Sequence, residues 1–126
     1  MLDEAQARAT VTAHVADEAK ATGRDLVVLD RCDRLPLGFA FYYQTRAFAE
    51  TGDRNKMLIG NGPLFVDARD GALFPLGSNL AFVQHFYAAY ERAFSAAPPP
   101  AAERAGLVKA EFGRFREAIR ARRRVR

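Results

Sequence analysis

The sequence has no tryptophan, a single cysteine and no long hydrophobic run, and each absence narrows the kind of protein it encodes. Because Cys32 has no second cysteine to pair with, no internal disulfide can form, which fits a reducing compartment. A membrane-spanning helix needs about 20 consecutive apolar residues, and no such run is present. The chain starts with acidic residues and no apolar segment, which predicts no secretory signal. We therefore expect a cytoplasmic protein with no membrane association.

Familiar catalytic and metal-binding patterns are also missing from the sequence. His14 and His85 are the only histidines, and neither stands in a spacing that completes a common metal-ligand set. There is no Gly-x-Ser-x-Gly elbow. The glycine-rich turn at 60–62 leads into an expected strand, whereas a phosphate-binding loop opens a helix with a lysine. We predict no catalytic residue, no metal and no cofactor, and an enzyme is a minor alternative.

Two other candidates for chemistry have simpler explanations. Cys32 lies between Arg31 and Arg34, and positive neighbours lower the pKa of a thiol. A lone cysteine among charged turn residues is nevertheless usually incidental. Asp67 and Asp70 form a pair of carboxylates, which glycosidases also use. Here a turn explains Asp70 and a strand carries Asp67, so neither residue predicts catalysis.

Length and charge describe one globular domain with a basic end. The chain has 126 residues, 49% of them hydrophobic and 27% charged, which is ordinary for a globular protein with a real core. Residues 114–126 hold seven arginines and one glutamate, a net charge of +6, so the other 113 residues sum to −2. The basic segment is interpreted as a solvated end, as a surface for an acidic protein, or as a nucleic-acid contact. The candidates for the last two roles are Arg116, Arg120, Arg123 and Arg124.

The first half of the chain predicts a helix followed by strands. Residues 3–22 are rich in helix formers, and Gly23 stands where a C-terminal cap belongs. Residues 26–29 form a continuous apolar run typical of a buried strand, followed by an expected polar turn at 31–36. Residues 38–45 are a second, aromatic strand. Alternation along it places Phe39, Phe41 and Tyr43 on one face, in the core, and Ala40, Tyr42 and Gln44 on the other.

A β-hairpin over residues 63–76 is the clearest local prediction. Pro63 can open a strand because the first position need not donate its amide. Asp70-Gly71 is a strong turn signal between two apolar runs. Residues 46–50, directly after the aromatic strand, are either a helical turn or a bulged continuation of that strand, and residues 56–59 are expected as a short edge segment.

The last third predicts two helices separated by prolines. Residues 79–94 carry a wide aromatic stripe at helical spacing, which favours packing on the sheet, and Ser78 or Asn79 supplies the N-cap. Three prolines then break regular structure before a helix at 102–122. The expected class is α+β: an N-terminal helix, a four-stranded antiparallel meander, one helix packed on the sheet, and a basic helix. The expected organisation is a domain at 1–95, a Pro-rich linker at 96–101 and the basic C-terminal helix at 102–126.

Two stretches also carry a family resemblance. Residues 60–77 read GNGPLFVDARDGALFPLG and residues 38–53 read GFAFYYQTRAFAETGD. Both are similar to the YrhB-like family, also called the immunity protein 35 family of bacterial polymorphic toxin systems, over roughly residues 25–94. Phe39 stands where the family pattern has tryptophan. The resemblance implies a protein that neutralises a cognate toxin by direct, stoichiometric binding.

The hypotheses for function follow from these patterns. The first is an immunity protein whose exposed strand and loop residues bind the toxin, namely Tyr42, Gln44, Arg46, Asn61, Asp67, Arg69 and Asp70. Exposed tyrosine is favoured at protein interfaces, although packing is the simpler interpretation of Tyr42. The second is a nucleic-acid-associated protein that acts through its arginines, and the third is a chaperone-like holdase that uses the aromatic helix at 80–94. The toxin and the oligomeric state are not determined by the sequence.

Overall fold

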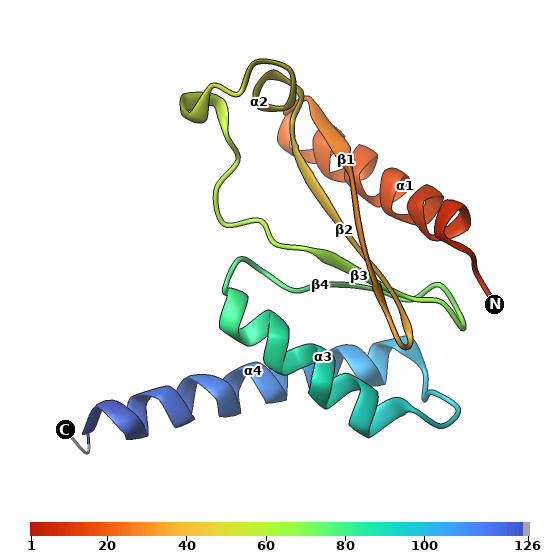
Figure 1. The fold of residues 1–126 in the computed structure, drawn as a ribbon, viewed down its shortest axis with the longest axis vertical. Coiled ribbons are helices and arrows are strands. Elements are labelled where there is room, and N and C mark those ends of the chain that lie inside the picture. Colours follow the sequence, from red (N-terminus) through yellow and green to blue (C-terminus); the bar gives the residue numbers. More distant parts are fainter. Residues whose placement is uncertain (125–126) are drawn as a thin grey trace. The chain divides into compact units, whose positions relative to one another are not determined.

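The computed structural model describes residues 1–124 and has a mixed α+β architecture (Figure 1). One antiparallel sheet contains four strands in the order β1-β2-β3-β4, so the predicted meander is confirmed. The chain divides into two compact units, residues 1–78 and residues 79–126.

The first unit contains the sheet and three helical segments. In chain order these are α1 (Glu4–Thr22), β1 (Leu26–Leu35), β2 (Gly38–Thr45), α2 (Arg46–Thr51), the 3-10 turn η1 (Arg54–Lys56), β3 (Leu64–Asp67) and β4 (Leu73–Pro75). The predicted hairpin at 63–76 corresponds to β3 and β4, in which Phe65 pairs with Phe74. The ambiguous segment after β2 is the helix α2, whose first turn is capped by the side chain of Thr45.

Helix α1 starts and stops where its sequence predicts. The Asp3 side chain accepts a hydrogen bond from the Gln6 amide, and the Gln6 side chain accepts one from the Asp3 amide, which forms a capping box. Gly23 ends the helix in the left-handed conformation with φ 69°. One stripe of α1 packs on one face of the sheet, where it forms a core with Phe41, Tyr43 and their neighbours. The members of this core are Ala7, Val11, Val15, Leu26, Phe41, Tyr43, Leu64 and Val66, so the predicted inward face of β2 is confirmed.

The expected turn at 31–36 is wrong, because β1 continues to Leu35. The pairing of β1 with β2 shifts register between Val28 and Cys32, which marks a bulge. The guanidinium of Arg8, from α1, donates to the carbonyl oxygens of Leu29 at 2.8 Å and Asp30 at 2.9 Å. These bonds satisfy backbone groups at the bulge. The polar residues that suggested a turn therefore belong to a strand, whose side chains alternate between its two faces.

Close backbone contacts explain two glycines of the first unit. A Cβ atom on Gly62 would lie 1.5 Å from the carbonyl oxygen of Gly77, so the residues that flank the β3–β4 hairpin touch through their backbones. A Cβ atom on Gly38 would lie 1.9 Å from the Val66 oxygen, at the start of β2. At both positions only glycine fits without moving the chain.

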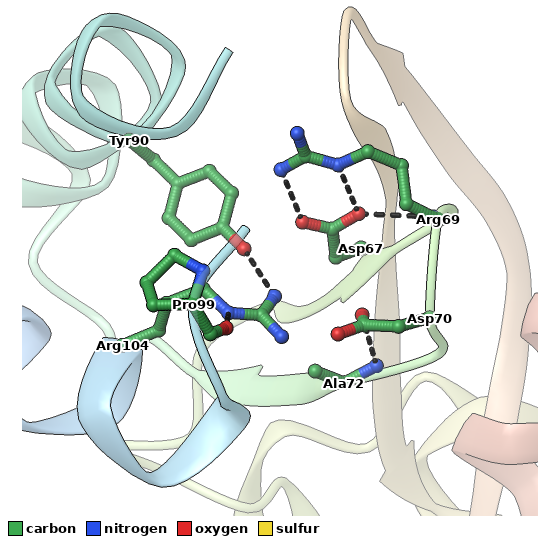
Figure 2. A network of polar contacts seen from close by, with 7 residues as sticks. All are labelled: Asp67, Arg69, Asp70, Ala72, Tyr90, Pro99 and Arg104. Carbon is green, nitrogen blue, oxygen red and sulfur yellow. Dashed lines mark hydrogen bonds and ion pairs between the residues drawn. The ribbon is translucent and has the colours of Figure 1, made fainter. Parts of the chain in front are cut away.

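The second unit is a pair of helices, α3 (Leu80–Phe94) and α4 (Ala101–Arg124). Asn79 caps α3, as predicted. The aromatic stripe of α3 packs on α4, because Phe82 lies edge-to-face with Phe112 at 4.7 Å between ring centroids and with Phe115 at 5.7 Å. Arg104 is fully buried, and its guanidinium donates to the Tyr90 hydroxyl at 2.9 Å and the Pro99 carbonyl at 2.8 Å (Figure 2). No helix among residues 1–124 is both long enough and apolar enough to span a bilayer.

Candidate partner-binding surface

Tyr42 lies in a small polar cluster on the sheet face opposite α1. Its hydroxyl donates to the Asp33 carboxylate at 2.6 Å, and the Arg31 guanidinium lies over its ring at 4.2 Å from the centroid. Arg31 also donates two hydrogen bonds of 3.2 Å to Asp33. Burial of the phenol and the bond to Asp33 raise the pKa of Tyr42 to about 12. The cluster therefore holds a half-buried tyrosine and an exposed arginine in fixed positions.

Gln44 and Asn61 fix the loop that follows η1. The Gln44 side chain donates to the Leu58 carbonyl at 3.0 Å and accepts from the Leu58 amide at 2.9 Å. Asn61 donates to the Tyr43 carbonyl at 2.7 Å, and the Thr45 hydroxyl donates to the Lys56 carbonyl at 2.7 Å. These side chains take the place of strand pairing, so the expected edge segment at 56–59 is not a strand. Both Gln44 and Asn61 are half-buried and bind the protein's own backbone.

Arg46 is exposed and directly follows β2. It therefore lies at the end of the β1–β2 pair that is away from the turn joining these two strands. Its Nε lies 3.1 Å from an Asp25 carboxylate oxygen, and its Nη1 lies 4.0 Å from Glu50 one turn along α2. Its backbone amide donates to the Asp25 carbonyl at 2.9 Å. With 51% of its side chain exposed, Arg46 is accessible to a partner.

The three predicted hairpin residues have different surroundings (Figure 2). Asp67 is fully buried and accepts two hydrogen bonds from the Arg69 guanidinium, at 3.0 Å and 2.8 Å, and one from the Arg69 amide at 2.9 Å. Asp70 is exposed and its carboxylate accepts from the Ala72 amide at 3.1 Å, as the turn signal predicts. Asp67 therefore shapes the hairpin, and Asp70 is the accessible carboxylate of the pair.

The surroundings of Cys32 outweigh the effect that its arginine neighbours have on the thiol. Burial of the thiol and then the nearby Glu4 carboxylate raise its pKa, and they outweigh the lowering effects of Arg8 and Arg34. A raised pKa reduces the thiolate fraction and so disfavours nucleophilic chemistry. Among the residues that the structure describes, no group of three or more histidine, cysteine, aspartate or glutamate side chains is placed to hold a metal ion.

The second unit carries the basic candidates and a histidine contact that sequence spacing did not reveal. Arg116, Arg120 and Arg123 are exposed on α4, while the side chain of Arg124 lies outside the described part of the chain. Arg120 pairs with Glu117 at 3.6 Å. His85 on α3 lies 2.6 Å from Glu111 on α4, which also pairs with Arg114. These basic partners lower the pKa of Glu111.

Three side chains with structural roles around β1 are not singled out by the sequence patterns. Arg31 and Asp33 stand in a polar stretch typical of a turn, and Arg8 is one of several charged residues on α1. The spacing of two between Arg31 and Asp33 places them on one face of a strand and is an available signal. Nothing local identifies Arg8, because its carbonyl acceptors lie more than 20 positions away in the sequence.

The fold and this surface define a small α+β protein whose accessible charged and aromatic groups are held by its own backbone and side chains. The immunity protein 35 family model matches residues 3–90, and the chain belongs to that family. A relative from Escherichia coli strain K12, described as "Uncharacterized protein YrhB", is 36% identical over 52 residues. That match spans 41% of this chain and 55% of the relative. No solved structure matches.

Proposed function

We propose that this protein is an immunity protein that neutralises a cognate toxin in the cytoplasm by binding it directly, with no chemistry of its own. The observation that carries the proposal is the extent of the family match. Residues 3–90 include nearly all of the first unit and most of α3, and they end before α4 begins. A function that the family shares therefore belongs to the matched part of the chain, which contains Tyr42, Arg46 and the hairpin.

The side-chain environments divide the candidate residues into two groups. Tyr42, Arg46 and Asp70 have accessible groups whose positions are fixed by neighbours, so they contact the toxin. Gln44, Asn61 and Asp67 bind the protein's own chain, so they position the surface. Arg69 is largely covered and pairs with Asp67, so it belongs to the second group. Fixing these groups before binding lowers the entropic cost of association.

The test of function uses the tagged full-length chain expressed in its native host. A protein that purifies with it in a fixed ratio is then expressed alone and together with this chain in a sensitive bacterium. We expect arrested growth when the captured protein is expressed alone, and restored growth when this chain is present in stoichiometric amount. A captured protein that is not toxic, or protection without complex formation, would overturn the proposal.

The test of the surface compares two double variants that leave buried residues unchanged. Tyr42→Ala with Arg46→Ala removes two proposed contacts, and Asp17→Ala with Lys20→Ala removes two exposed charges from α1. We expect the first variant to weaken toxin binding by about tenfold or more, and the second to bind as the unaltered chain does. Equal affinity for both variants would show that this surface is the wrong one.

A second candidate function rests on the exposed arginines of α4. Arg116, Arg120 and Arg123 are spaced by four and three residues, which places them on one side of the helix. Such a row can contact an acidic protein or a phosphate backbone. Binding to duplex DNA that falls steeply with added salt, and is lost on substitution of these three arginines by alanine, would support this function. Salt-independent or absent binding would exclude it.

A further inference from the structure

Residues 54–59, here called the cationic loop, expose two apolar and two positively charged side chains within one short stretch of chain. Ile59 is 83% exposed and Met57 is 37% exposed, whereas Leu58 between them packs against the core. Single exposed apolar residues are common on protein surfaces and need no explanation by themselves. The features that distinguish Ile59 are the rigid backbone that carries it and the charges around it.

The backbone of the cationic loop is fixed by side chains of β2. Gln44 makes two hydrogen bonds to the backbone of Leu58, and Thr45 binds the carbonyl of Lys56. Asn61 ties the end of the loop to the Tyr43 carbonyl. Because both sides of Ile59 are tied to one strand, little conformational entropy remains to be lost when a partner covers it.

The charges accessible at the cationic loop are positive. Arg54 and Lys56 are exposed, and neither forms an ion pair with any residue that the structure describes. The adjacent carboxylate, Asp53, is half-buried and accepts from the Asn55 amide at 3.0 Å, so it is less accessible than the two cations. A partner that covers Ile59 therefore meets two cations, which are complemented by carboxylates around an apolar pocket.

We propose that the cationic loop inserts Ile59 into an apolar pocket of the toxin that is bordered by aspartate or glutamate side chains. The inference rests on the proposed function and adds the chemistry of the partner's site. Ile59 and Met57 supply the apolar contact, and Arg54 and Lys56 pair with the bordering carboxylates. Gln44 is a positioning residue, because it holds the loop without touching the toxin.

The central experiment measures binding of the captured toxin to two matched variants of the full-length chain. Ile59→Ser removes the proposed contact, and Leu80→Ser removes an aliphatic side chain that is 71% exposed at the start of α3. We expect Ile59→Ser to weaken binding by about tenfold or more and Leu80→Ser to leave it unchanged. Both positions are exposed, so both variants should keep the unaltered melting temperature.

The outcomes separate this inference from the function on which it rests. If the unaltered chain binds and neutralises the toxin but Ile59→Ser does so equally well, the cationic loop is not the contact and the proposed function stands. If the unaltered chain captures no toxin, both proposals fail. If Ile59→Ser instead converts a dimer of this chain into a monomer in light scattering, the pocket belongs to a second copy and the inference is overturned.

Two further measurements test the charges and the positioning role. Arg54→Ala with Lys56→Ala should slow association and reduce its dependence on salt, whereas Arg24→Ala with Lys20→Ala should change neither.

Gln44→Ala should speed hydrogen exchange at the Leu58 amide and weaken toxin binding, although Gln44 makes no contact with the toxin. Fast exchange at Leu58 with unchanged affinity would exclude the positioning role.

Discussion

The two compact units of this protein are stabilised by different kinds of contact. In residues 1–78, α1 packs aliphatic side chains on a sheet, and backbone segments touch at glycines. In residues 79–126, aromatic rings join α3 to α4. The net charges also differ, because the first unit has nine basic and eleven acidic residues, or −2, and the second has ten and four, or +6. The first unit therefore depends on close packing of backbone and side chains, whereas α4 leaves much of its surface exposed.

Removal of a core aromatic ring should have the largest effect on the free energy of unfolding, and this effect should differ between the two units. Phe41 is fully buried, so Phe41→Ala should lower the free energy of unfolding by about 4 kcal/mol. Phe112 is only half-buried, so Phe112→Ala should cost less. Urea unfolding followed by circular dichroism measures both. A larger loss for Phe112→Ala would contradict the stated difference between the units.

Alanine at a glycine should have opposite effects in the two units. Gly62→Ala forces a Cβ atom against the Gly77 backbone and should cost about 3 kcal/mol. A Cβ atom on Gly106 of α4 would meet only open space, so Gly106→Ala should stabilise the helix by about 1 kcal/mol. Thermal melting of the two variants makes the comparison. Equal effects of the same sign would show that close fit does not distinguish the units.

Removal of the Arg8 guanidinium should destabilise the bulge of β1. Arg8→Met keeps much of the apolar stem but leaves the Leu29 and Asp30 carbonyls without this donor, which should cost about 2 kcal/mol. Relative to the unaltered chain, Arg8→Met should accelerate amide exchange more along residues 28–32 than along β3. The variant Lys20→Met, at an exposed position of the same helix, serves as the control. Unchanged exchange around the bulge would mean that Arg8 does not hold it.

Alkaline pH should weaken the first unit. Burial and the Glu18 carboxylate raise the pKa of Tyr43 to about 12, above the value of about 10 for an exposed tyrosine. A raised pKa gives stability that is complete below pH 10 and is lost as the pH rises toward 12, because the unfolded chain releases its proton first. Denaturant unfolding across this range should show the decline, and Tyr43→Phe should reduce it. A slope that Tyr43→Phe leaves unchanged would refute this cause.

Acidic pH should weaken the second unit, by less than alkaline pH weakens the first. Hydrogen bonds from Arg114 and His85 lower the pKa of Glu111, so its contribution is present at neutral pH and is lost as the pH falls through the lowered value. Protection factors for amide exchange in α3 and α4, which correct for the slower intrinsic exchange in acid, should fall on acidification more in the unaltered chain than in Glu111→Gln. Identical acid responses would show that this contact does not contribute to the stability of the helix pair.

Elements whose signals are local can be predicted from the sequence alone. The capping box at Asp3, the glycine cap at Gly23 and the Asp70-Gly71 turn each act within a few residues, so the sequence predicts the helix and the hairpin close to their true bounds. Alternation along β2 likewise identifies Phe41 and Tyr43 as core residues. The family resemblance comes from two such local stretches, and the family match confirms it.

Contacts between groups that are distant in the sequence became visible only in the folded chain. Arg8 reaches carbonyl groups that lie 21 and 22 positions away, and this contact accompanies a strand where the polar sequence suggested a turn. Gln44 makes two hydrogen bonds to the backbone of Leu58 across 14 positions, a contact that no local sequence pattern predicts. Burial beside Glu4 reversed the expected effect of arginines on Cys32. Burial and long-range hydrogen bonds depend on which segments pack together, so they are properties of the folded chain.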